Sequence, residues 1–319
     1  MSQDNLFFYD YHPQPDDFYG EVLAGLQAKP KYIPAKFFYD ETGSRLFEEI
    51  TRLPEYYLTR TENEILNRYA PDIADCVGDN CVLVEPGSGN NSKVRILLEQ
   101  LKPSAYVPME ISKDHMQASA KELAADYDWL PVHAACADFT QPLALPMQQV
   151  EEKIVAFFPG STIGNFEPEA AVDLMHNFAH MVGPNGGLVI GVDLKKDREL
   201  LQAAYDDSRG VTAQFNRNLL IRMNRELTAN FQLENFQHQA RYNPQIGRME
   251  SYLESRIGQD VVIGDTTVSF RENECIHTEN SYKYDVEEFQ DLAQTAGFKP
   301  RRVWRDEQGL FSVHYMECA

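Results

Sequence analysis

The stretch LVEPGSGNNSK, residues 83–93, decides how this chain folds. It overlaps the apolar run CVLVE at 81–85, which predicts a short buried strand. Gly87 and Gly89 follow without a Cβ, so the backbone there can pass close to a ligand. A helix predicted over 92–101 then offers its first N–H groups to an anionic group. Taken alone, the turn also fits an ordinary connection between a strand and a helix.

Acidic residues at two later strand ends extend this pattern. A dinucleotide fingerprint needs a third glycine where Ser92 stands, which argues against NAD and favours a ligand without a pyrophosphate. Glu110 ends the next predicted strand, where a carboxylate can accept both hydroxyls of a ribose. Asp138 and Phe139 follow the third strand and suit an adenine, by a hydrogen bond and by stacking. This order of parts is that of an S-adenosylmethionine-dependent methyltransferase.

Helices and strands alternate on both sides of the glycine turn, which indicates βαβ units and a parallel sheet. The final helix, which begins at 286 and ends at Gly297, and a hairpin turning near Asp306–Gly309 can complete an edge of that sheet. The helices are expected over residues 62–77, 92–101, 112–127 and 168–182, and the strands over 81–85, 105–112, 131–139, 153–161 and 187–194.

The alternation stops near residue 195. A long helical stretch at 203–227 and β-like segments up to about residue 270 follow. We therefore expect two interleaved domains. Residues 61–195 and 283–319 form the nucleotide-binding one, and residues 1–60 and 196–282 form an α+β one that binds substrate.

Composition excludes several classes of protein. The 49 acidic and 29 basic residues give a net charge of −20, which argues against a nucleic-acid binder. No apolar run approaches the roughly 18–20 residues of a membrane span, and no N-terminal targeting signal is visible. We expect a cytoplasmic enzyme or small-molecule binder, without nucleic-acid or membrane partners. Its five scattered cysteines, expected to be reduced thiols, are Cys76, Cys81, Cys136, Cys275 and Cys318.

Five long segments resemble the histidine Nα-methyltransferase family of ergothioneine biosynthesis. The resemblance covers about residues 20–315. It implies a Rossmann-like class I methyltransferase fold, α/β with a mostly parallel seven-stranded sheet and a terminal antiparallel hairpin. It also implies three methyl transfers to the α-amine of histidine, which yield hercynine. We further expect a monomeric enzyme. The segments are YIPAKFFYDETGSRLFEEITRLPEYYLTRTENEIL at 32–66, EPGSGNNSK at 85–93, FFPGSTIGNFEP at 157–168, AYDDSRGVTAQFNRNLL at 204–220 and TENSYKY at 278–284.

The resemblance also assigns site residues. Asn165 and Tyr205 match the groups that hold the substrate carboxylate, and both can donate a hydrogen bond. Tyr39 and Gly160 match the neighbourhood of the reacting amine and are the expected catalytic positions. The positions that match side-chain recognition are Tyr56, Glu279 and Ser281. The positions that match contacts to S-adenosylmethionine, and to its product S-adenosylhomocysteine, are Tyr39, Gly87, Ser88, Gly89, Lys93, Glu110, Asp138 and Phe139.

One departure bears on the substrate. Ser251 and Tyr252 stand where the resemblance places a methionine–tryptophan pair beside the substrate side chain, so Ser251 is expected to line a wider pocket. Another aromatic amino acid such as tryptophan is therefore an alternative substrate. A cofactor-binding protein without turnover is the non-enzymatic alternative. His176 and His180 have a spacing that metal sites use, but no Glu or cysteine cluster accompanies them and no metal is expected.

Overall fold

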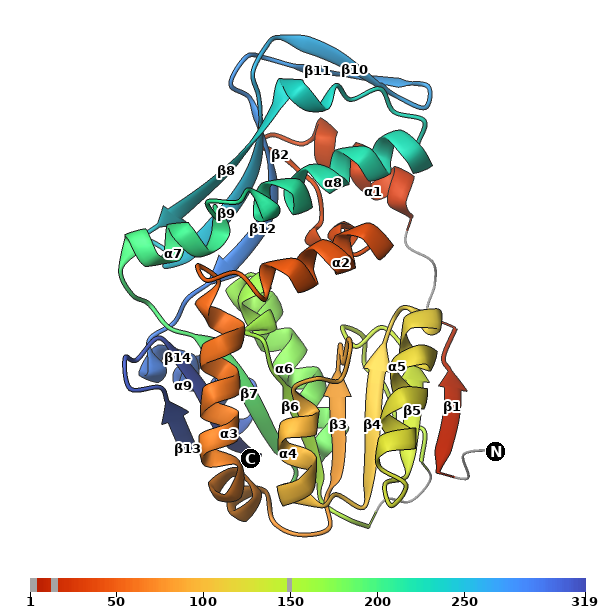
Figure 1. Cartoon of the computed structure of the whole chain (residues 1–319), viewed down its shortest axis with the longest axis vertical. Coiled ribbons are helices and arrows are strands. Elements are labelled where there is room, and N and C mark those ends of the chain that lie inside the picture. Colours follow the sequence, from red (N-terminus) through yellow and green to blue (C-terminus); the bar gives the residue numbers. More distant parts are fainter. Residues whose placement is uncertain (1–4, 13–16, 148–150) are drawn as a thin grey trace. The chain divides into compact units, whose positions relative to one another are not determined.

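The computed structural model describes residues 5–12, 17–147 and 151–319 (Figure 1). The chain divides into two compact units. Unit 1 lies within Met1–Gln14, Thr61–Leu194 and Tyr284–Ala319, and unit 2 lies within Pro15–Arg60 and Lys195–Lys283. The sequence-based boundaries assign residues 1–60 to the second domain, whereas the first of the unit 1 segments ends at Gln14; residues 1–4 and 13–16 lie outside the described residues.

Unit 1 is built on a mostly parallel sheet in the order β1-β5-β4-β3-β6-β7-β14-β13. The predicted α/β fold with a terminal antiparallel hairpin is confirmed, because β13 and β14 pair antiparallel and β14 runs antiparallel to β7. The strands are β1 (Leu6–Asp10), β3 (Val82–Pro86), β4 (Ala105–Glu110), β5 (Val132–Cys136), β6 (Ile154–Phe158), β7 (Gly187–Asp193), β13 (Phe298–Arg305) and β14 (Phe311–Cys318).

The predicted count of seven strands is wrong, since the described residues form eight. The additional strand is β1, which pairs parallel with β5 from Leu6 opposite Val132 to Asp10 opposite Cys136. The segment carries Phe7, Phe8 and Tyr9 but no turn signal, and its partner lies more than 120 residues away. Nothing local could therefore assign it to this sheet.

Helices cover the sheet of unit 1, with α4 and α5 in front of the strands in Figure 1. The central strands β3 and β7 are buried along their whole length, as expected for parallel strands covered on both faces. Within the described residues, no helix has the length and apolar character needed to cross a bilayer. The helices are α3 (Tyr57–Val77, in this unit from Thr61), α4 (Val94–Leu101), α5 (Lys113–Asp126), α6 (Pro168–Val182), α9 (Val286–Thr295) and the short 3-10 helix η2 (Thr162–Asn165).

Unit 2 has a four-stranded sheet in the order β2-β12-β9-β8, and a separate hairpin of β10 and β11. Helix α8 packs against α2, β8 and β9. The strands are β2 (Lys31–Tyr32), β8 (Phe236–Asn243), β9 (Arg248–Ser255), β10 (Gln259–Ile263), β11 (Thr266–Phe270) and β12 (Cys275–Tyr282). The helices are α1 (Phe18–Gln27), η1 (Ala35–Phe38), α2 (Glu41–Ile50), α7 (Arg198–Tyr205), α8 (Val211–Glu226) and η3 (Leu233–Asn235).

The single helical stretch predicted over 203–227 is wrong, because it is two helices with a break between Tyr205 and Val211. Gly210 has a φ of +70°, which a continuous helix does not allow. Asp207 caps the second helix by accepting from the N–H groups of Val211 at 3.0 Å and Thr212 at 2.7 Å. The break leaves Tyr205 at the carboxyl end of α7.

Candidate functional site

The turn after β3 has the shape that its glycines predict. Gly87 and Gly89 have φ values of +67° and +54°. The N–H groups of Gly87 and Ser88 donate to the Met109 carbonyl at 2.8 and 3.1 Å, which ties the turn to β4. A Cβ on Gly87 would lie 3.1 Å from Phe139 Cε1. The structure therefore brings together Gly87 and Phe139, two of the predicted cofactor contacts.

Buried polar atoms in this turn fit a bound ligand. Ser88 Oγ and Asn91 Nδ2 are buried, and neither has a hydrogen-bond partner within the described part of the chain. A buried polar group without a partner is costly, so such atoms are suited to bind polar atoms of a ligand. The turn thus fits a nucleoside-type cofactor such as S-adenosylmethionine.

Glu85 supports the turn from inside the sheet. The Tyr106 hydroxyl donates to Glu85 Oε2 and lies 2.9 Å from Asn91 Oδ1. Burial raises the pKa of Glu85 to about 8, against the opposing effects of the Tyr106 hydrogen bond and the Lys93 charge. A protonated Glu85 at neutral pH is a rigid hydrogen-bonding link between β3, β4 and the turn.

The predicted ribose and adenine residues lie at the carboxyl ends of β4 and β5. Glu110 is partly exposed, and its Oε1 accepts from the Ile111 N–H at 2.8 Å. Asp138 Oδ1 accepts from the Thr140 N–H at 2.9 Å and the Thr140 hydroxyl at 2.6 Å, which fixes the turn that presents Phe139. Parallel strands end at one edge of the sheet, where ligands of open α/β folds bind.

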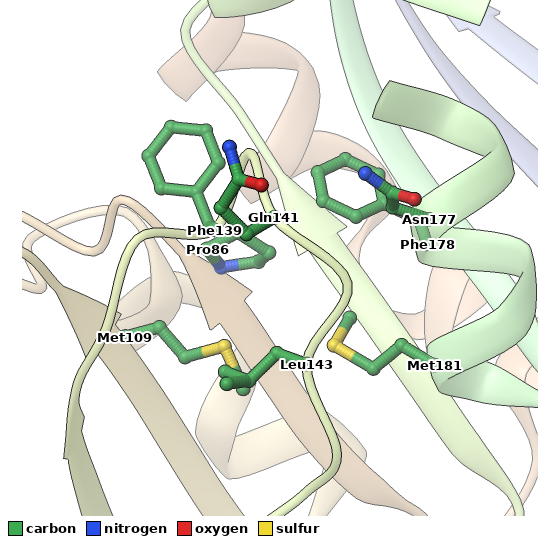
Figure 2. A pocket seen from close by; sticks show the side chains of 8 residues that line it. All are labelled: Pro86, Met109, Phe139, Gln141, Leu143, Asn177, Phe178 and Met181. Atoms are coloured by element: carbon green, nitrogen blue, oxygen red, sulfur yellow. The ribbon is translucent and has the colours of Figure 1, made fainter. Parts of the chain in front are cut away.

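A small pocket adjoins Phe139 and is mostly apolar (Figure 2). The amides of Gln141 and Asn177 are its polar groups, and Asn177 Nδ2 donates to the Thr140 carbonyl at 2.9 Å. This apolar lining with two amides borders the Phe139 ring and Pro86, next to the glycine turn. The lining residues are Pro86, Met109, Phe139, Gln141, Leu143, Asn177, Phe178 and Met181.

Glu62 is a site residue that sequence reasoning missed. It is only 1% exposed, forms a 2.5 Å ion pair with Lys93 Nζ, and accepts from the Gly160 N–H at 2.8 and 3.0 Å. It thereby joins two predicted positions, Lys93 and Gly160. The available signal was its place on the apolar stripe of α3 with Ile65 and Leu66, where a charge is unexpected. A Cβ on Gly191 would overlap its carboxylate.

Asn165 ends η2 and is half-buried. Ser161, just before this 3-10 helix, has a φ of +57°, and its hydroxyl accepts from the Asp193 N–H at 2.9 Å. The strand β7 therefore holds the loop that carries Asn165. Its role toward a carboxylate stays a prediction.

In unit 2 the predicted Tyr205 and Ser281 meet at a buried lysine. The Tyr205 hydroxyl lies 2.8 Å from Ser281 Oγ, and Lys283 Nζ lies 2.8 Å from each of these oxygens. Lys283 is 1% exposed and its ammonium also lies 4.9 Å from the centre of the Tyr205 ring. Sequence reasoning missed Lys283, because a lysine after a strand usually lies at the surface.

Glu279 and Ser251 complete this group, which we call the β12 polar cluster: Tyr205, Ser251, Glu279, Ser281 and Lys283. Ser251 on β9 pairs with Glu279 on β12, and its Oγ lies 3.5 Å from Glu279 Oε2. Burial raises the pKa of Glu279 to about 7, although the Lys283 charge and the Ser251 hydroxyl act in the opposite direction.

Tyr252 does not share this environment. Neighbouring residues of a strand point to opposite faces, so Tyr252 faces away from Glu279. Its hydroxyl donates to Glu250 Oε2 at 2.8 Å and its ring stacks edge-on with His277. Of the departing pair, Ser251 alone belongs to the polar cluster.

Two predicted tyrosines lie in an aromatic group of the same unit. Tyr56 is buried and contacts Tyr205 edge-on, with ring centres 6.3 Å apart. Tyr39 is 46% exposed, and its ring lies 5.8 Å from Phe47 and 5.9 Å from Phe215. The fold thus brings Tyr56 to the β12 polar cluster and leaves a face of Tyr39 accessible.

His238 holds the backbone of Tyr205. Its Nε2 lies 2.8 Å from the Tyr205 carbonyl and its Nδ1 lies 2.8 Å from Asn216 Nδ2. These partners require Nε2 to carry the proton, since a carbonyl only accepts. Burial lowers the pKa of His238, so this neutral form is favoured.

The rings of His176 and His180 lie 5.7 Å apart on α6. Residues 5–12, 17–147 and 151–319 contain no group of three or more His, Cys, Asp or Glu side chains that could hold a metal. The two histidines therefore lack the further ligands that a metal site needs.

Comparison with known proteins agrees with this geometry. The profile of a family described as "histidine-specific methyltransferase, SAM-dependent" matches residues 18–318. The histidine N-alpha-methyltransferase of Mycolicibacterium smegmatis is 38% identical over 299 residues, and that of Mycobacterium tuberculosis is 40% identical over 300, in each case with 92% of both chains covered. Ergothioneine biosynthesis protein 1 of Schizosaccharomyces pombe is 28% identical over 280 residues, which cover 84% of this chain and 36% of that protein.

Proposed function

Because the chain belongs to the family of histidine-specific, S-adenosylmethionine-dependent methyltransferases, we propose that it methylates the α-amine of L-histidine to form Nα,Nα,Nα-trimethylhistidine, hercynine. Its place in ergothioneine biosynthesis is part of this proposal and is supported by the similarity to a protein of that pathway. The observation that carries the substrate assignment is the carboxylate of Glu279 beside Ser251, Ser281 and Lys283.

Unit 1 supplies the cofactor site. The residues that would hold S-adenosylmethionine are those of the glycine turn, Glu110 for the ribose, and Asp138 with Phe139 for the adenine. When bound, the cofactor supplies a methyl group on a positively charged sulfur. Glu62 and Lys93 act indirectly in this proposal, because Glu62 pairs with Lys93 and accepts from the Gly160 N–H, which holds the Gly160 backbone in place.

Unit 2 supplies recognition of the substrate side chain. Glu279 accepts an imidazole N–H, and the hydroxyl of Ser281 faces the same ring. A site that hydrogen-bonds its substrate rejects analogues that leave its buried polar groups unpaired, which explains a preference for histidine over apolar side chains. Asn165 and Tyr205 belong to the proposal as the predicted contacts of the carboxylate common to every α-amino acid, with the Asn165 amide as its donor.

Alignment is the main source of catalysis in this proposal, since a near-attack geometry contributes several kcal/mol. The α-amine must be neutral when it attacks, and the site residues include no strong dedicated base. Proton loss to water fits this arrangement. The exposed ring of Tyr39 can stabilise a methylated ammonium by roughly 0.5–2 kcal/mol through cation–π attraction.

Ser251 favours one competing substrate class. Its small side chain beside Glu279 leaves room for a ring larger than imidazole, such as the indole of tryptophan. The polar groups around Glu279 count against this alternative. An indole has one N–H for the Glu279 carboxylate but no acceptor nitrogen for the Ser281 hydroxyl. A cofactor-binding protein without turnover is the other alternative.

The location and the oligomeric state of the enzyme belong to the same proposal. All five cysteines are free thiols, in keeping with a reducing cytoplasm. We propose a cytoplasmic monomer, and sedimentation analysis of the purified chain measures the mass.

A methyl-transfer screen tests the function. The enzyme is incubated with isotope-labelled S-adenosylmethionine and each of the twenty amino acids, together with histamine, and the products are resolved by mass spectrometry. We expect labelled trimethylhistidine from histidine and little product from histamine, which lacks the carboxylate. A preference for tryptophan would support the competing substrate, equal use of histamine would contradict the carboxylate assignment, and no product would support the binding protein.

A further inference from the structure

Lys283 occupies a position where a positive charge is costly. Its side chain is 1% exposed, and its ammonium lies 2.8 Å from both Tyr205 Oη and Ser281 Oγ. A buried ammonium is tolerated only when acceptors take its protons. The lysine therefore commits both of these hydroxyl oxygens as acceptors.

The donors and acceptors of Tyr205, Ser281 and Lys283 limit how these three groups can bond to one another. An ammonium only donates, whereas a hydroxyl has one proton and two lone pairs. The bond between Tyr205 and Ser281 uses one of their two hydroxyl protons. With Tyr205 as its donor, Ser281 accepts from Tyr205 and Lys283, so its lone pairs are filled and only its proton remains. Lys283 thus turns the Ser281 hydroxyl into a group that can only donate.

An acceptor lies on the same side of the strand. Glu279, Ser281 and Lys283 alternate along β12 and its continuation, so their side chains share one face. An ionised Glu279 only accepts, and the positive charge of Lys283 favours that ionised form. The face thus presents an acceptor at Glu279 next to a donor at Ser281. A neutral imidazole has the complementary pair, one N–H and one unprotonated nitrogen.

We propose that Lys283 is a positioning residue that makes the site selective for the neutral imidazole of histidine. By donating to Tyr205 and Ser281, it leaves the Ser281 hydroxyl as an obligate donor to the unprotonated ring nitrogen, while Glu279 accepts the ring N–H. This role rests on the proposed function, and it adds a specificity determinant that touches the substrate only through its neighbours.

The test measures binding, so that it stays separate from turnover. Calorimetry in the presence of S-adenosylhomocysteine gives the Kd of three ligands at pH 8.5, where Glu279 is ionised. They are histidine, β-(pyrrol-3-yl)alanine, which keeps the N–H and lacks the acceptor nitrogen, and β-(thiazol-4-yl)alanine, which keeps the nitrogen and lacks the N–H. We expect the wild-type chain to prefer histidine over each analogue by about tenfold or more, the effect of one hydrogen bond.

In Lys283→Met the preference for histidine over the pyrrole is expected to fall to about threefold or less, because the hydroxyls regain acceptor capacity. The preference for histidine over the thiazole is expected to persist, since Glu279 still accepts the ring N–H of histidine. Ser281→Ala is expected to match Lys283→Met, and the double variant to add nothing further. Lys196→Met is the matched control, because Lys196 also donates to a tyrosine hydroxyl, that of Tyr57, at 2.7 Å.

Equal losses of affinity for histidine and the pyrrole in Lys283→Met would overturn the proposal, as they indicate a general structural role. Unchanged affinity of S-adenosylhomocysteine shows that the variant is folded. If Lys283→Met does not fold, Ser281→Ala carries the test through the same ratio, and an unchanged ratio there overturns the proposal. Absence of turnover by a wild-type chain that binds histidine selectively would contradict the proposed function alone.

Discussion

Ser251 lies directly opposite Glu279 across the β9–β12 pair, with its Oγ 3.5 Å from Glu279 Oε2. The sheet register thus places the residue that departs from the family pattern beside the carboxylate proposed to read the substrate. At 3.5 Å the contact is too long for a strong hydrogen bond, so the serine constrains Glu279 weakly. In the proposed site, these two side chains together would set the volume and charge next to the substrate ring.

Replacing Glu279 by alanine should change selectivity. The substitution removes the acceptor for the imidazole N–H, so we expect kcat/KM for histidine to fall at least tenfold while the value for tryptophan or phenylalanine rises relative to it. The measurement is the histidine-to-tryptophan ratio of kcat/KM. Glu254→Ala on the neighbouring strand is the control. An unchanged ratio in Glu279→Ala would refute the imidazole role.

Ser251→Met should narrow the pocket beside Glu279. The longer apolar side chain adds packing against an imidazole and takes space from a larger ring, so we expect any activity on tryptophan to drop several-fold relative to histidine. Ser269→Met, an exposed serine on β11, serves as the control. An unchanged histidine-to-tryptophan ratio of kcat/KM in Ser251→Met would show that this residue does not line the substrate pocket.

Glu110→Ala should weaken the cofactor far more than the amino acid. Charge-assisted hydrogen bonds contribute on the order of 1.5–3 kcal/mol, so a roughly ten- to hundredfold rise in the Kd of S-adenosylhomocysteine is expected. Calorimetry measures this Kd, with the exposed Asp114→Ala as a control on the next helix. Unaltered cofactor affinity would remove Glu110 from the ribose site.

Glu62→Gln should disturb the cofactor side through Lys93. Glutamine keeps an acceptor for the Gly160 N–H and loses the charge that pairs with Lys93, so the partly buried Lys93 ammonium is left without this counter-ion. We expect a rise of about tenfold in the Kd of S-adenosylhomocysteine and a lower melting temperature. Glu64→Gln on the exposed side of α3 should change neither. Equal behaviour of the two variants would contradict the positioning role of Glu62.

Glu85 predicts a pH dependence of stability. Its pKa is raised from 4.5 to about 8 in the folded state by burial, so the folded chain retains a proton that the unfolded chain releases. The stabilisation is complete below about pH 4.5 and is lost as the pH rises through about 8. We expect the free energy of unfolding to decrease by up to about 1.4 kcal/mol per pH unit in that window from this group.

Glu85→Gln removes the titrating group and should flatten this decrease. Urea unfolding at pH 5, 6, 7 and 8 gives the slope for the wild type and the variant, and Glu64→Gln supplies the reference for an exposed carboxylate. A slope in Glu85→Gln as steep as that of the wild type would show that Glu85 is ionised in the folded state.

Local patterns predict where the proposed cofactor residues of unit 1 lie in the fold. The glycines, Glu110 and Phe139 each follow a strand with a clear apolar pattern, and parallel strands bring their ends to one edge. Lys93 was assigned to the cofactor from a motif, whereas the structure pairs it with Glu62. A charged residue on an amphipathic helix gives no sign of its partner, since the partner belongs to another element.

Local pattern alone determined the order of helices and strands in unit 1 from α3 onward, the glycine turn and the terminal hairpin, because each depends on the chemistry of neighbouring residues. Tertiary structure decided which charges are buried and which distant segments meet. It placed β1 beside β5, split the helical stretch at Gly210, and buried Lys283 against Tyr205, 78 residues away in sequence. The cost of burying a charge or leaving a strand edge unpaired depends on the whole packed environment, which no single stretch of sequence contains.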